Sequence, residues 1–351
     1  MTATQNSLKP RNILVIRNDK LGDFMLAWPA FALLKKQYPD CRVTALVPEY
    51  TRPIAEQCQW IDDILIDEKG KYTLSSARLL ASKIREKQFD TSISLFSEFR
   101  TALALWLADI PVRLAPATKI AQVLYTHTLK QRRSRSEKPE FEYNSDLIRH
   151  YIKLNHDQPV TPQTPPFLKF DKESITLLRN NYRKKHHIEE NTKLVIIHPG
   201  SGGSAINLSL NQYAELSRLI SKQHNVHIII TAGPNELVFS SDLSALLADI
   251  AHSVYHSTAG LVEFSRFIAI GDLFISGSTG TLHIAGAINV PTAAFYPARR
   301  SATSLRWQTL NTENNRIAFM PSTHKNNNDM RSINLDSCTQ EITKLLKTNH
   351  S

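Results

Sequence analysis

The chain has 351 residues, which is longer than one typical hydrophobic core requires and predicts two domains. Hydrophobic residues make up 42% and charged residues 21%, an ordinary balance for a globular protein, and no apolar run has the length of a membrane-spanning helix. The formal net charge of +10 either serves solubility or indicates an anionic partner.

The first half of the chain alternates between short apolar runs and amphipathic segments. The runs predict strands at 12–17, 42–47, 62–66 and 90–96. An apolar stripe predicts a helix over 24–38, which Pro39 ends, and a further helix over 141–154 closes this half. The polar, proline-rich stretch 155–167 is where we expect the interdomain boundary.

The second half repeats this plan. A strand at 193–198 leads through a glycine-rich turn to an amphipathic helix at 210–223 and a strand at 226–231. The turn "AGPNE" begins another helix. Further strands are expected near 253–256, 272–276 and 291–296.

Together these elements predict an α/β fold. The first two strands of each half start about thirty residues apart, which is the span of a βαβ unit. We therefore expect two Rossmann-like domains with parallel sheets, at 1–165 and 166–330, and a C-terminal helix in 331–351 that packs back on the first domain.

Cysteine and histidine spacing indicates neither a disulfide framework nor a metal site. The cysteines (Cys41, Cys58 and Cys338) are odd in number and form no CxxC pair, and the thirteen histidines form no HExxH motif. The start of the chain is polar and has no secretory signal. We expect a cytoplasmic protein without a protein-bound metal.

Three loops follow predicted strands, at the sheet edge where ligands bind in such folds. "RNDKLGD" at 17–23 follows the first strand and carries two acids, two bases and a glycine. "HPGSGGS" at 198–204 occupies the same place in the second half, where its N–H groups either cradle an anion or form an ordinary connection.

The third loop lies in "ISGSTGTLHIAGA" at 275–287. Hydroxyl residues at the start of its helix and the first-turn N–H groups suit a diphosphate, although Ser278 or Thr279 could simply cap the helix. His283 is a polar residue in a buried helix, and a lone histidine there is more often a packing residue than a ligand contact.

Four segments, in order and at matching spacing over residues 12–310, resemble glycosyltransferase family 9, the ADP-heptose:lipopolysaccharide heptosyltransferases. They are "ILVIRNDKLGDFMLAWPAFALLKKQYP", "IIHPGSGGS", "AGPNE" and "STGTLHIAGAINVPTAAFYP". The resemblance implies the GT-B architecture, with two facing Rossmann-like domains, the acceptor on the first and the nucleotide sugar mainly on the second. It also implies inverting chemistry with an ADP-sugar as donor substrate and no cofactor.

The resemblance assigns Asp23 as the catalytic base that removes the proton from the acceptor hydroxyl. Without it, the simplest interpretation is that Asp23 caps helix 24–38 or favours its dipole. Asp19 and Lys20 are expected to line the same cleft. The implied donor-binding residues are Ser201, Gly202, Glu236, Ser278, Thr279, Gly280, Thr281 and His283.

The implied acceptor is the anionic Kdo/lipid A inner core of lipopolysaccharide. "KQRRSRSEK" at 130–138 carries five basic residues and one acid, and is either an acceptor site or a solvated loop. The acceptor-binding residues expected from this chain are Arg17, Lys20, Arg100, Arg132, Arg133 and Arg135, with Arg113 as a further helper.

Two segments depart from the family pattern on the donor side. Ser278 stands where relatives usually carry an acid. Ile206, Leu208 and Ser209 stand where relatives usually carry a basic residue followed by Trp-Pro. These departures leave open another nucleotide-sugar donor, or a non-catalytic scaffold that binds nucleotide.

The leading hypothesis is a cytoplasmic heptosyltransferase that acts at the inner face of the inner membrane. Its partners would be a nucleotide sugar and the lipopolysaccharide core. A nucleic-acid partner is not expected, because the basic residues form one local run without interleaved aromatics.

Overall fold

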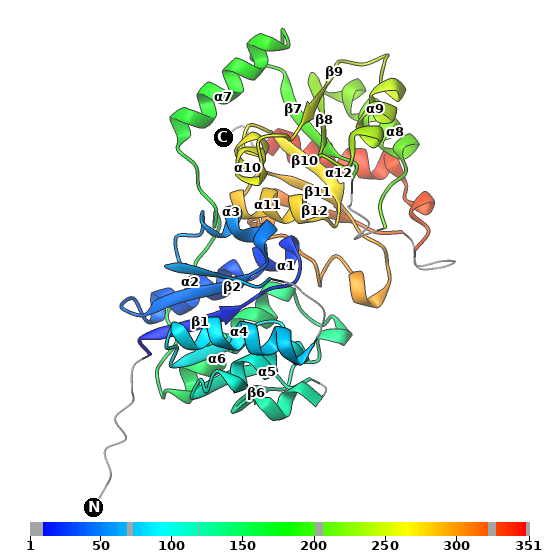
Figure 1. The fold of residues 1–351 in the computed structure, drawn as a ribbon. Coiled ribbons are helices and arrows are strands. Elements are labelled where there is room, and N and C mark those ends of the chain that lie inside the picture. The colour runs from blue at the N-terminus through cyan, green and yellow to red at the C-terminus, as the bar shows by residue number, and fades with distance from the viewer. Residues whose placement is uncertain (1–9, 69–72, 119, 201–205, 322–327, 349–351) are drawn as a thin grey trace, which may run out of the picture. The chain divides into compact units, whose positions relative to one another are not determined.

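The computed structural model describes residues 10–68, 73–118, 120–200, 206–321 and 328–348. Two compact units result: residues 1–133 with 140–163 form the first, and 134–139 with 164–351 form the second. The sequence prediction put the boundary after residue 165 and did not anticipate that 134–139 joins the second unit. The first unit is blue to green in Figure 1 and the second is green to red.

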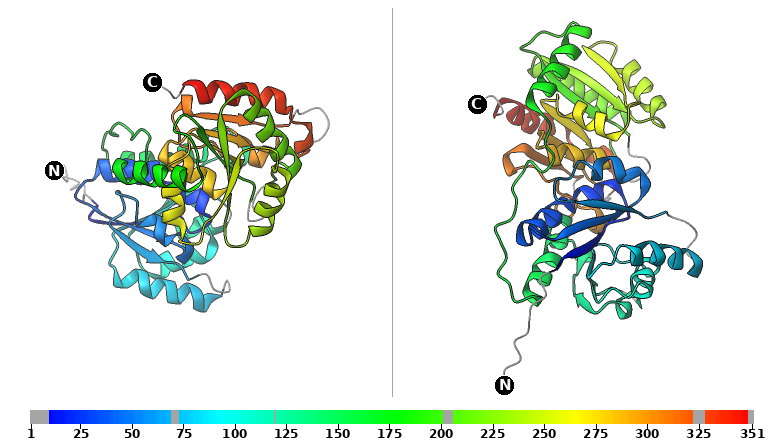
Figure 2. Two further views of the ribbon diagram at one scale, coloured as in Figure 1. Left: turned by 90° about the horizontal axis from the view of Figure 1, so that it is seen from above. Right: turned by 60° about the vertical axis from the view of Figure 1, so that its left-hand side comes forward.

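The first unit is built on a six-stranded parallel sheet with strand order β3-β2-β1-β4-β5-β6. The side chains of Leu14 and Ile16 in β1 pack with α4 and α5 on one face, and α2 and α6 pack together in the same unit. Figures 1 and 2 show the helices layered against the sheet. Its strands are β1 (Asn12–Ile16), β2 (Arg42–Val47), β3 (Asp63–Ile66), β4 (Thr91–Ser94), β5 (Val112–Pro116) and β6 (His127–Leu129). Its helices are α1 (Leu21–Met25), α2 (Trp28–Gln37), α3 (Arg52–Ala55), α4 (Leu74–Glu86), α5 (Phe99–Leu107) and α6 (Glu140–Leu154), with the 3₁₀ turns η1 (Glu49–Thr51) and η2 (Ile120–Leu124).

The helix predicted over 24–38 is two helices, α1 and α2, separated at Leu26 and Ala27. Pro29 lies in the first turn of α2, where its missing N–H costs no hydrogen bond. Because α1 starts at Leu21, Asp23 lies inside its first turn, and the residue at the N-cap position is Lys20. Asp23 is therefore not the N-cap residue, but as an acid in the first turn it does favour the helix dipole.

The second unit has a six-stranded parallel sheet with strand order β12-β11-β10-β7-β8-β9. One face packs on α8 and α12 through alternate residues such as Val195 and Ile228, and α10 packs against both α7 and α11. Its strands are β7 (Lys193–His198), β8 (Val226–Ala232), β9 (His252–His256), β10 (Leu273–Gly277), β11 (Thr292–Phe295) and β12 (Arg316–Phe319). Its helices are α7 (Lys172–Lys185), α8 (Leu210–Gln223), α9 (Leu237–Leu246), α10 (Leu261–Ile268), α11 (Gly280–Ile288) and α12 (Leu335–Thr348). Further 3₁₀ turns of the chain are η3 (Arg133–Arg135), η4 (Arg300–Ala302), η5 (Glu313–Asn315) and η6 (Met330–Ser332).

The C-terminal helix α12 packs on the second unit, so the prediction that it returns to the first domain is wrong. Cys338, Ile342, Leu345 and Leu346 lie in one hydrophobic core with Val195 and other residues of the second sheet. Thr343 also donates a hydrogen bond to Gln223 at the end of α8, over 2.9 Å. The apolar face of α12 is satisfied there.

Both sheets have the same topological switch point. β1 pairs with β2 on one side and β4 on the other, and β7 pairs with β8 and β10 in the same way. The strand order reverses next to β1 and next to β7, so the connections after neighbouring strands run to opposite faces of the sheet. In such sheets this reversal leaves a crevice at the carboxyl ends of the strands. Two of the three loops singled out from the sequence lie there.

Candidate active site

In the first unit, the loop after β1 is organised around a buried arginine. Arg17 is only 2% exposed. Its Nε donates to Asp19 Oδ1 over 2.9 Å, and its Nη1 donates to Glu140 Oε1 and Asn144 Oδ1, both over 3.1 Å. Its Nη2 donates to Asp23 Oδ1. All three guanidinium nitrogens are thus engaged within the protein, which corrects the prediction that Arg17 contacts the acceptor.

Asp23 is held at the edge of this cluster with part of its carboxyl group accessible. The side chain is 15% exposed. Burial raises its pKa to about 7, the nearby carboxylates of Asp19 and Glu140 add to the rise, and the Arg17 guanidinium opposes it. A carboxylate whose pKa lies near neutral pH is a stronger base than an ordinary aspartate and still ionises at working pH. Asp23 therefore combines accessibility with basicity.

Arg100, also predicted to contact the acceptor, lies in a second buried cluster. It is 5% exposed, and its Nη2 donates to both carboxylate oxygens of Asp67 over 2.6 and 2.5 Å. Asn18 donates to Asp67 over 2.5 Å and to Thr101 over 3.3 Å. The pairing fixes the start of α5 next to the loop after β1, so Arg100 is a structural residue and that prediction is wrong.

The other basic residues predicted for the acceptor divide between surface and interior. Lys20 and Arg132 are exposed in the first unit. Arg133 is half-buried, pairs with Glu140 over 2.6 Å and lies over the ring of Tyr143, so it supports the Arg17 cluster. Arg135 is exposed and belongs to the segment that joins the second unit. Arg113 donates to the carbonyls of Leu124 and Ile110, which leaves it a structural role.

In the second unit, the loop after β10 forms a capped helix start. The Thr279 side chain at the N-cap accepts a hydrogen bond from the Leu282 N–H over 3.4 Å and lies 2.9 Å from the Thr281 hydroxyl. Gly280 is the first residue of α11, and Ser278 is half-buried just before it. First-turn N–H groups point away from a helix, and the helix dipole adds positive potential there. This end of α11 is suited to an anion.

His283 lies buried in the first turn of α11 and is 3% exposed. Burial lowers its pKa to about 4, so the ring is neutral at neutral pH. Its Nδ1 has no hydrogen-bond partner among the residues that the structure describes. A buried polar atom left in this state is uncommon in proteins.

Glu236 and His198 form a pair across the ends of β7 and β8. His198 Nε2 lies 3.4 Å from Glu236 Oε2, and its Nδ1 lies 3.0 Å from the Thr231 hydroxyl. Burial lowers the pKa of His198, although the Glu236 carboxylate opposes this. A Cβ at Gly200 would lie 2.1 Å from Glu236 Oε1, so the backbone after β7 and this carboxylate pack together only because residue 200 is glycine. Ser201 and Gly202 lie outside the described residues.

The residues that depart from the family pattern have structural roles here. Leu208 is buried and Ile206 packs against the core of the second unit. Ser209 caps α8, and its side chain accepts from the Gln212 N–H over 3.3 Å. Neither Ile206 nor Leu208 can supply a charge to a diphosphate.

Sequence reasoning missed Asn207, which ties the loop after β7 to the end of β10. Its Nδ2 donates to the Pro199 carbonyl over 2.9 Å, and its Oδ1 accepts from the Tyr213 hydroxyl over 2.6 Å. A Cβ at Gly277 would lie 2.5 Å from Asn207 Oδ1. Asn207 lies between two apolar residues in the sequence, and burying its amide there without hydrogen-bond partners would cost free energy. This pattern could have indicated a structural hydrogen-bonding role for Asn207.

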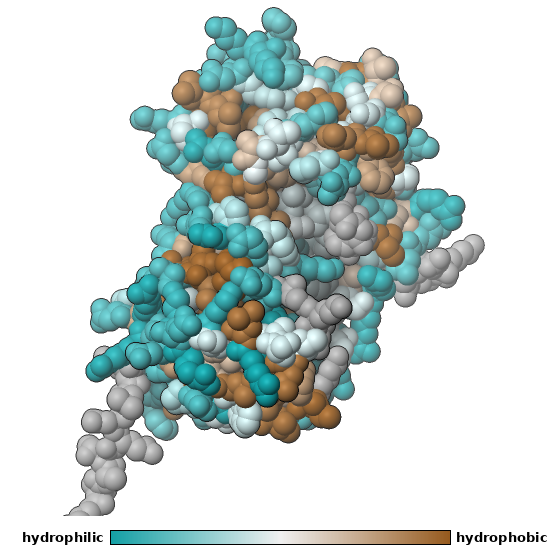
Figure 3. Space-filling model, in the orientation of Figure 1, coloured by the Kyte–Doolittle hydropathy of each residue, from teal (hydrophilic) through white to brown (hydrophobic). Residues whose placement is uncertain are grey.

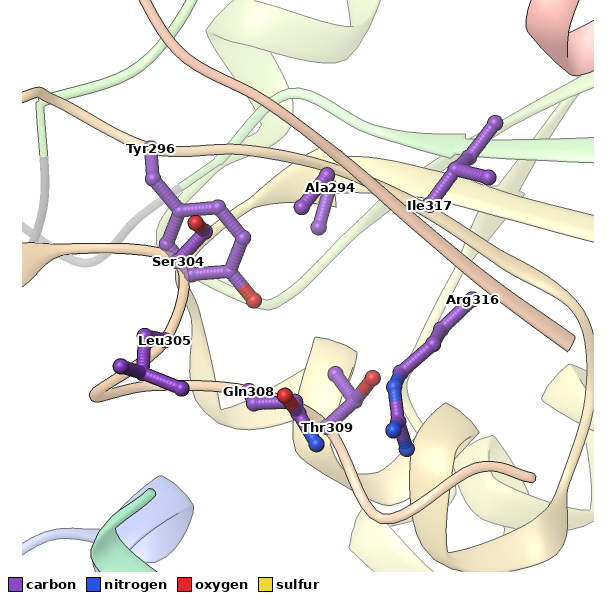
Figure 4. A pocket seen from close by; sticks show the side chains of 9 residues that line it. Ala294, Tyr296, Ser304, Leu305, Gln308, Thr309, Arg316 and Ile317 are labelled. Atoms are coloured by element: carbon purple, nitrogen blue, oxygen red, sulfur yellow. The ribbon is translucent and has the colours of Figure 1, made fainter. Parts of the chain in front are cut away.

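A cavity of about 270 Å³ also lies in the second unit, between β11, β12 and the chain around 304–309. Figure 4 shows Arg316 extending from β12 beside Thr309 and Gln308, with Tyr296 across from them. None of the predicted donor-binding residues lines it. It is therefore distinct from the candidate donor site at the ends of β7, β8 and β10.

The described residues contain no group of three or more His, Cys, Asp or Glu side chains that could hold a metal ion. No helix in the described part of the chain is long and apolar enough to cross a membrane.

Comparison with known proteins gives consistent matches along the chain. The model of glycosyltransferase family 9 (heptosyltransferase) matches residues 77–337. A Haemophilus influenzae protein named "Putative glycosyltransferase" is 44% identical over 336 residues, covering 95% of this chain and 96% of the relative. Lipopolysaccharide heptosyltransferase 2 of Salmonella typhimurium is 23% identical, covering 81% of this chain and 82% of the relative.

Solved structures share the fold. The structure of E. coli ADP-heptose lps heptosyltransferase II superposes with a TM-score of 0.76 at 18% sequence identity, covering 97% of this chain and 100% of the other. E. coli heptosyltransferase WaaC with ADP superposes with a TM-score of 0.71 at 14% identity, covering 95% and 99%. The predicted α/β class and the GT-B fold are confirmed.

Proposed function

Because the chain belongs to glycosyltransferase family 9, we propose that it transfers a heptose, with inversion, from ADP-heptose to the Kdo/lipid A inner core of lipopolysaccharide. The observation that carries this proposal is Asp23, a partly exposed carboxylate with a raised pKa at the switch point of the first sheet. Its arrangement supports general-base chemistry on an acceptor hydroxyl.

In the proposed reaction, Asp23 takes the proton of the acceptor hydroxyl while that oxygen forms a bond to the anomeric carbon. The bond between this carbon and the phosphate oxygen breaks, and its electron pair leaves with ADP. Because the attack comes from the face opposite the leaving group, the anomeric configuration inverts. Arg17 holds the Asp23 carboxyl in place and, as it keeps its charge, balances the carboxylate in the buried cluster.

The donor diphosphate is proposed to bind at the start of α11, where Thr279, Gly280 and Thr281 present hydroxyl and N–H groups. The helix dipole would stabilise the negative charge that develops on ADP as it leaves. Ser278 and His283 are proposed to contact the donor from the same loop and helix turn. We propose that no protein-bound metal takes part, which transfer assays with a chelator would test.

Glu236 is proposed to accept hydrogen bonds from the ribose of the donor. Its Oε2 already accepts from the Gly233 N–H over 3.1 Å, which aims the carboxyl group along the edge of the sheet. The apolar side chains of Ile206, which is half-buried, and Leu208, which is buried, favour a second possibility, a different sugar on the nucleotide, because these positions supply no cation to the donor. Ser201 and Gly202 remain proposed donor contacts from the sequence alone.

On the acceptor side, Lys20 and Arg132 are the proposed contacts because both are exposed in the first unit. They would attract the phosphates of the lipid A core. Arg135 remains proposed as well, on its exposure. Because the proposed acceptor is a lipid, we propose that the protein works in the cytoplasm at the inner face of the inner membrane.

A panel of nucleotide sugars separates these possibilities. The wild-type protein is incubated with ADP-, UDP- and GDP-linked sugars, and the melting temperature and the transfer to Kdo-lipid A are measured for each. The proposal expects the largest thermal shift and transfer with ADP-heptose. If another nucleotide sugar gives the larger thermal shift and transfer, that sugar is the donor. A thermal shift without transfer from any of the nucleotide sugars would indicate a nucleotide-binding scaffold.

A further inference from the structure

The first unit carries an exposed apolar patch on its surface that the proposed reaction does not use. Its members are Leu79 of α4, Trp106 of α5, and Ile120 and Val123 of η2. Between 49% and 77% of each of these residues is exposed. Scattered single apolar residues are ordinary on protein surfaces, but a contiguous group marks an interaction site.

These residues belong to elements that pack against each other. α5 packs against both α4 and η2, and the inward residues of the three elements share one core that includes Leu80, Ala102 and Ala121. Leu79, Trp106, Ile120 and Val123 are the outward-facing neighbours of these core residues. Figure 3 shows apolar side chains gathered on this part of the first unit.

Basic side chains border the patch. Arg85 of α4 is exposed and donates a hydrogen bond to the Leu107 carbonyl, next to Trp106. Arg113 donates to the Leu124 carbonyl, next to Val123, over 2.9 Å. Arg78 is exposed next to Leu79. The acids closest in sequence to this border are Glu86, which follows Arg85, and Asp109. Residues 73–130 hold eight basic against four acidic residues, so the net charge of the surroundings is positive.

We propose that this face, made by α4, α5 and η2, is the surface by which the protein docks on an anionic lipid bilayer. Leu79, Ile120 and Val123 would enter the boundary between headgroups and acyl chains, and Trp106 would lie at the headgroup level, where tryptophan is favoured. The exposed arginines of this border, Arg78 and Arg85, would pair with lipid phosphates. Apolar insertion and cationic attraction are the two contributions that reversible membrane binding requires.

The position of the patch agrees with a lipid acceptor. α5 begins beside the loop after β1, because Thr101 bonds Asn18 and the neighbouring Arg100 pairs with Asp67. Trp106 lies seven residues further along this helix, a rise of about 10 Å. A lipid-anchored sugar could therefore reach Asp23 while its anchor stays in the bilayer. The choice of lipid as partner rests on the proposed function, whereas the docking face itself rests on exposure and charge.

Vesicle binding tests the proposal directly. The full chain is mixed with vesicles of phosphatidylglycerol and phosphatidylethanolamine, or of phosphatidylcholine alone, and bound protein is separated by flotation. We expect binding to the anionic vesicles that weakens with salt, and at least a roughly tenfold loss of partitioning in the variant Trp106→Ser, Ile120→Ser, Val123→Ser. Val238→Ser, Phe239→Ser is the matched control, since these residues of α9 are 71% and 51% exposed in the second unit.

Activity on a soluble acceptor fragment without acyl chains separates docking from catalysis. The triple variant should keep the wild-type rate on this fragment and lose rate only on acceptor embedded in vesicles. Failure of wild type to bind anionic vesicles at low salt, or equal binding by the triple variant, overturns the docking face. A dimer of wild type that the triple variant breaks would also overturn it, since the patch would then bind a second copy. Absence of transfer by wild type to either acceptor would count against the proposed function and leave the vesicle result valid.

Discussion

Replacing Glu140 by glutamine tests how the protein sets the basicity of Asp23. Glu140 Oε1 accepts from Arg17 over 3.1 Å and from Arg133 over 2.6 Å, and the Glu140 carboxylate contributes to the raised pKa of Asp23. Glu140→Gln keeps a carbonyl oxygen for both arginines and removes one buried negative charge. Because a negative neighbour disfavours ionisation, its removal should lower the pKa of Asp23.

The size of the shift follows from the shared guanidinium. Glu140 and Asp23 accept hydrogen bonds from different nitrogens of the Arg17 guanidinium, which puts the two carboxylates roughly 5 Å apart. Two unit charges at this distance interact by about 3 kcal/mol at an effective dielectric constant of 20. Arg133 offsets part of the Glu140 charge, so we expect about half of this, roughly one pKa unit.

The assay is the pH dependence of kcat/KM, which reports the pKa of the essential base in the free enzyme. The wild-type rate should rise with pH to a plateau, with a midpoint at about 7 that reflects Asp23. The midpoint of Glu140→Gln should move to about 6. Glu142→Gln is the control on the same helix, since Glu142 pairs with Arg149 over 2.8 Å and its side chain is 37% exposed. A midpoint that stays in place or moves to higher pH in Glu140→Gln would refute this reasoning.

Three further predictions address other parts of the account. Gly200→Ala should displace the Glu236 carboxyl and raise the donor KM roughly tenfold through a lost charge-assisted hydrogen bond, whereas Gly233→Ala, whose Cβ would lie 3.4 Å away, should not; equal donor KM values would argue against the role of Glu236. Lys20→Ser with Arg132→Ser should raise the acceptor KM at low salt and leave the donor KM unchanged, as kinetics at two ionic strengths can check. Buried neutral His283 has a pKa of about 4 in the folded state and about 6.5 unfolded, so stability should fall as pH drops from 6.5 to 4, by up to about 3 kcal/mol more in wild type than in His283→Leu; parallel denaturation curves would contradict this.

Much of the fold could be predicted from the sequence because its signals are local. Apolar runs of four to six residues mark the central strands, such as β1 and β7, which are buried on both faces. The strands β5, β6 and β12 were missed, because these segments of three to five residues are partly exposed and have no such run. The break between α1 and α2 was also missed, since the apolar stripe continues through Leu26 and Ala27, both fully buried.

The sequence could predict site residues that a local motif identifies, but not the contacts that distant segments make in the fold. Thr279 was identified because it follows a strand at the start of a helix, and Asp23 was identified through the family resemblance of the loop after β1. The partners of Arg17 were not, because Glu140 and Asn144 lie more than 120 residues further along the chain, and only the packing of α6 brings them together. From the sequence alone, a basic residue in the loop after a strand is easily taken for a ligand contact, because its acidic partners lie far away along the chain. Arg100 was misassigned for this reason too, since its partner is Asp67.

The central claim is that Asp23 is the catalytic base, and the rate of Asp23→Asn tests it most directly. Transfer from ADP-heptose to Kdo-lipid A is measured for wild type and variant above pH 8, and ADP affinity is measured by titration calorimetry. The account predicts that transfer falls by about 10² to 10⁴, the usual contribution of a general base, while ADP affinity stays the same. Transfer by Asp23→Asn at a rate near that of wild type, with ADP bound equally well, would contradict it.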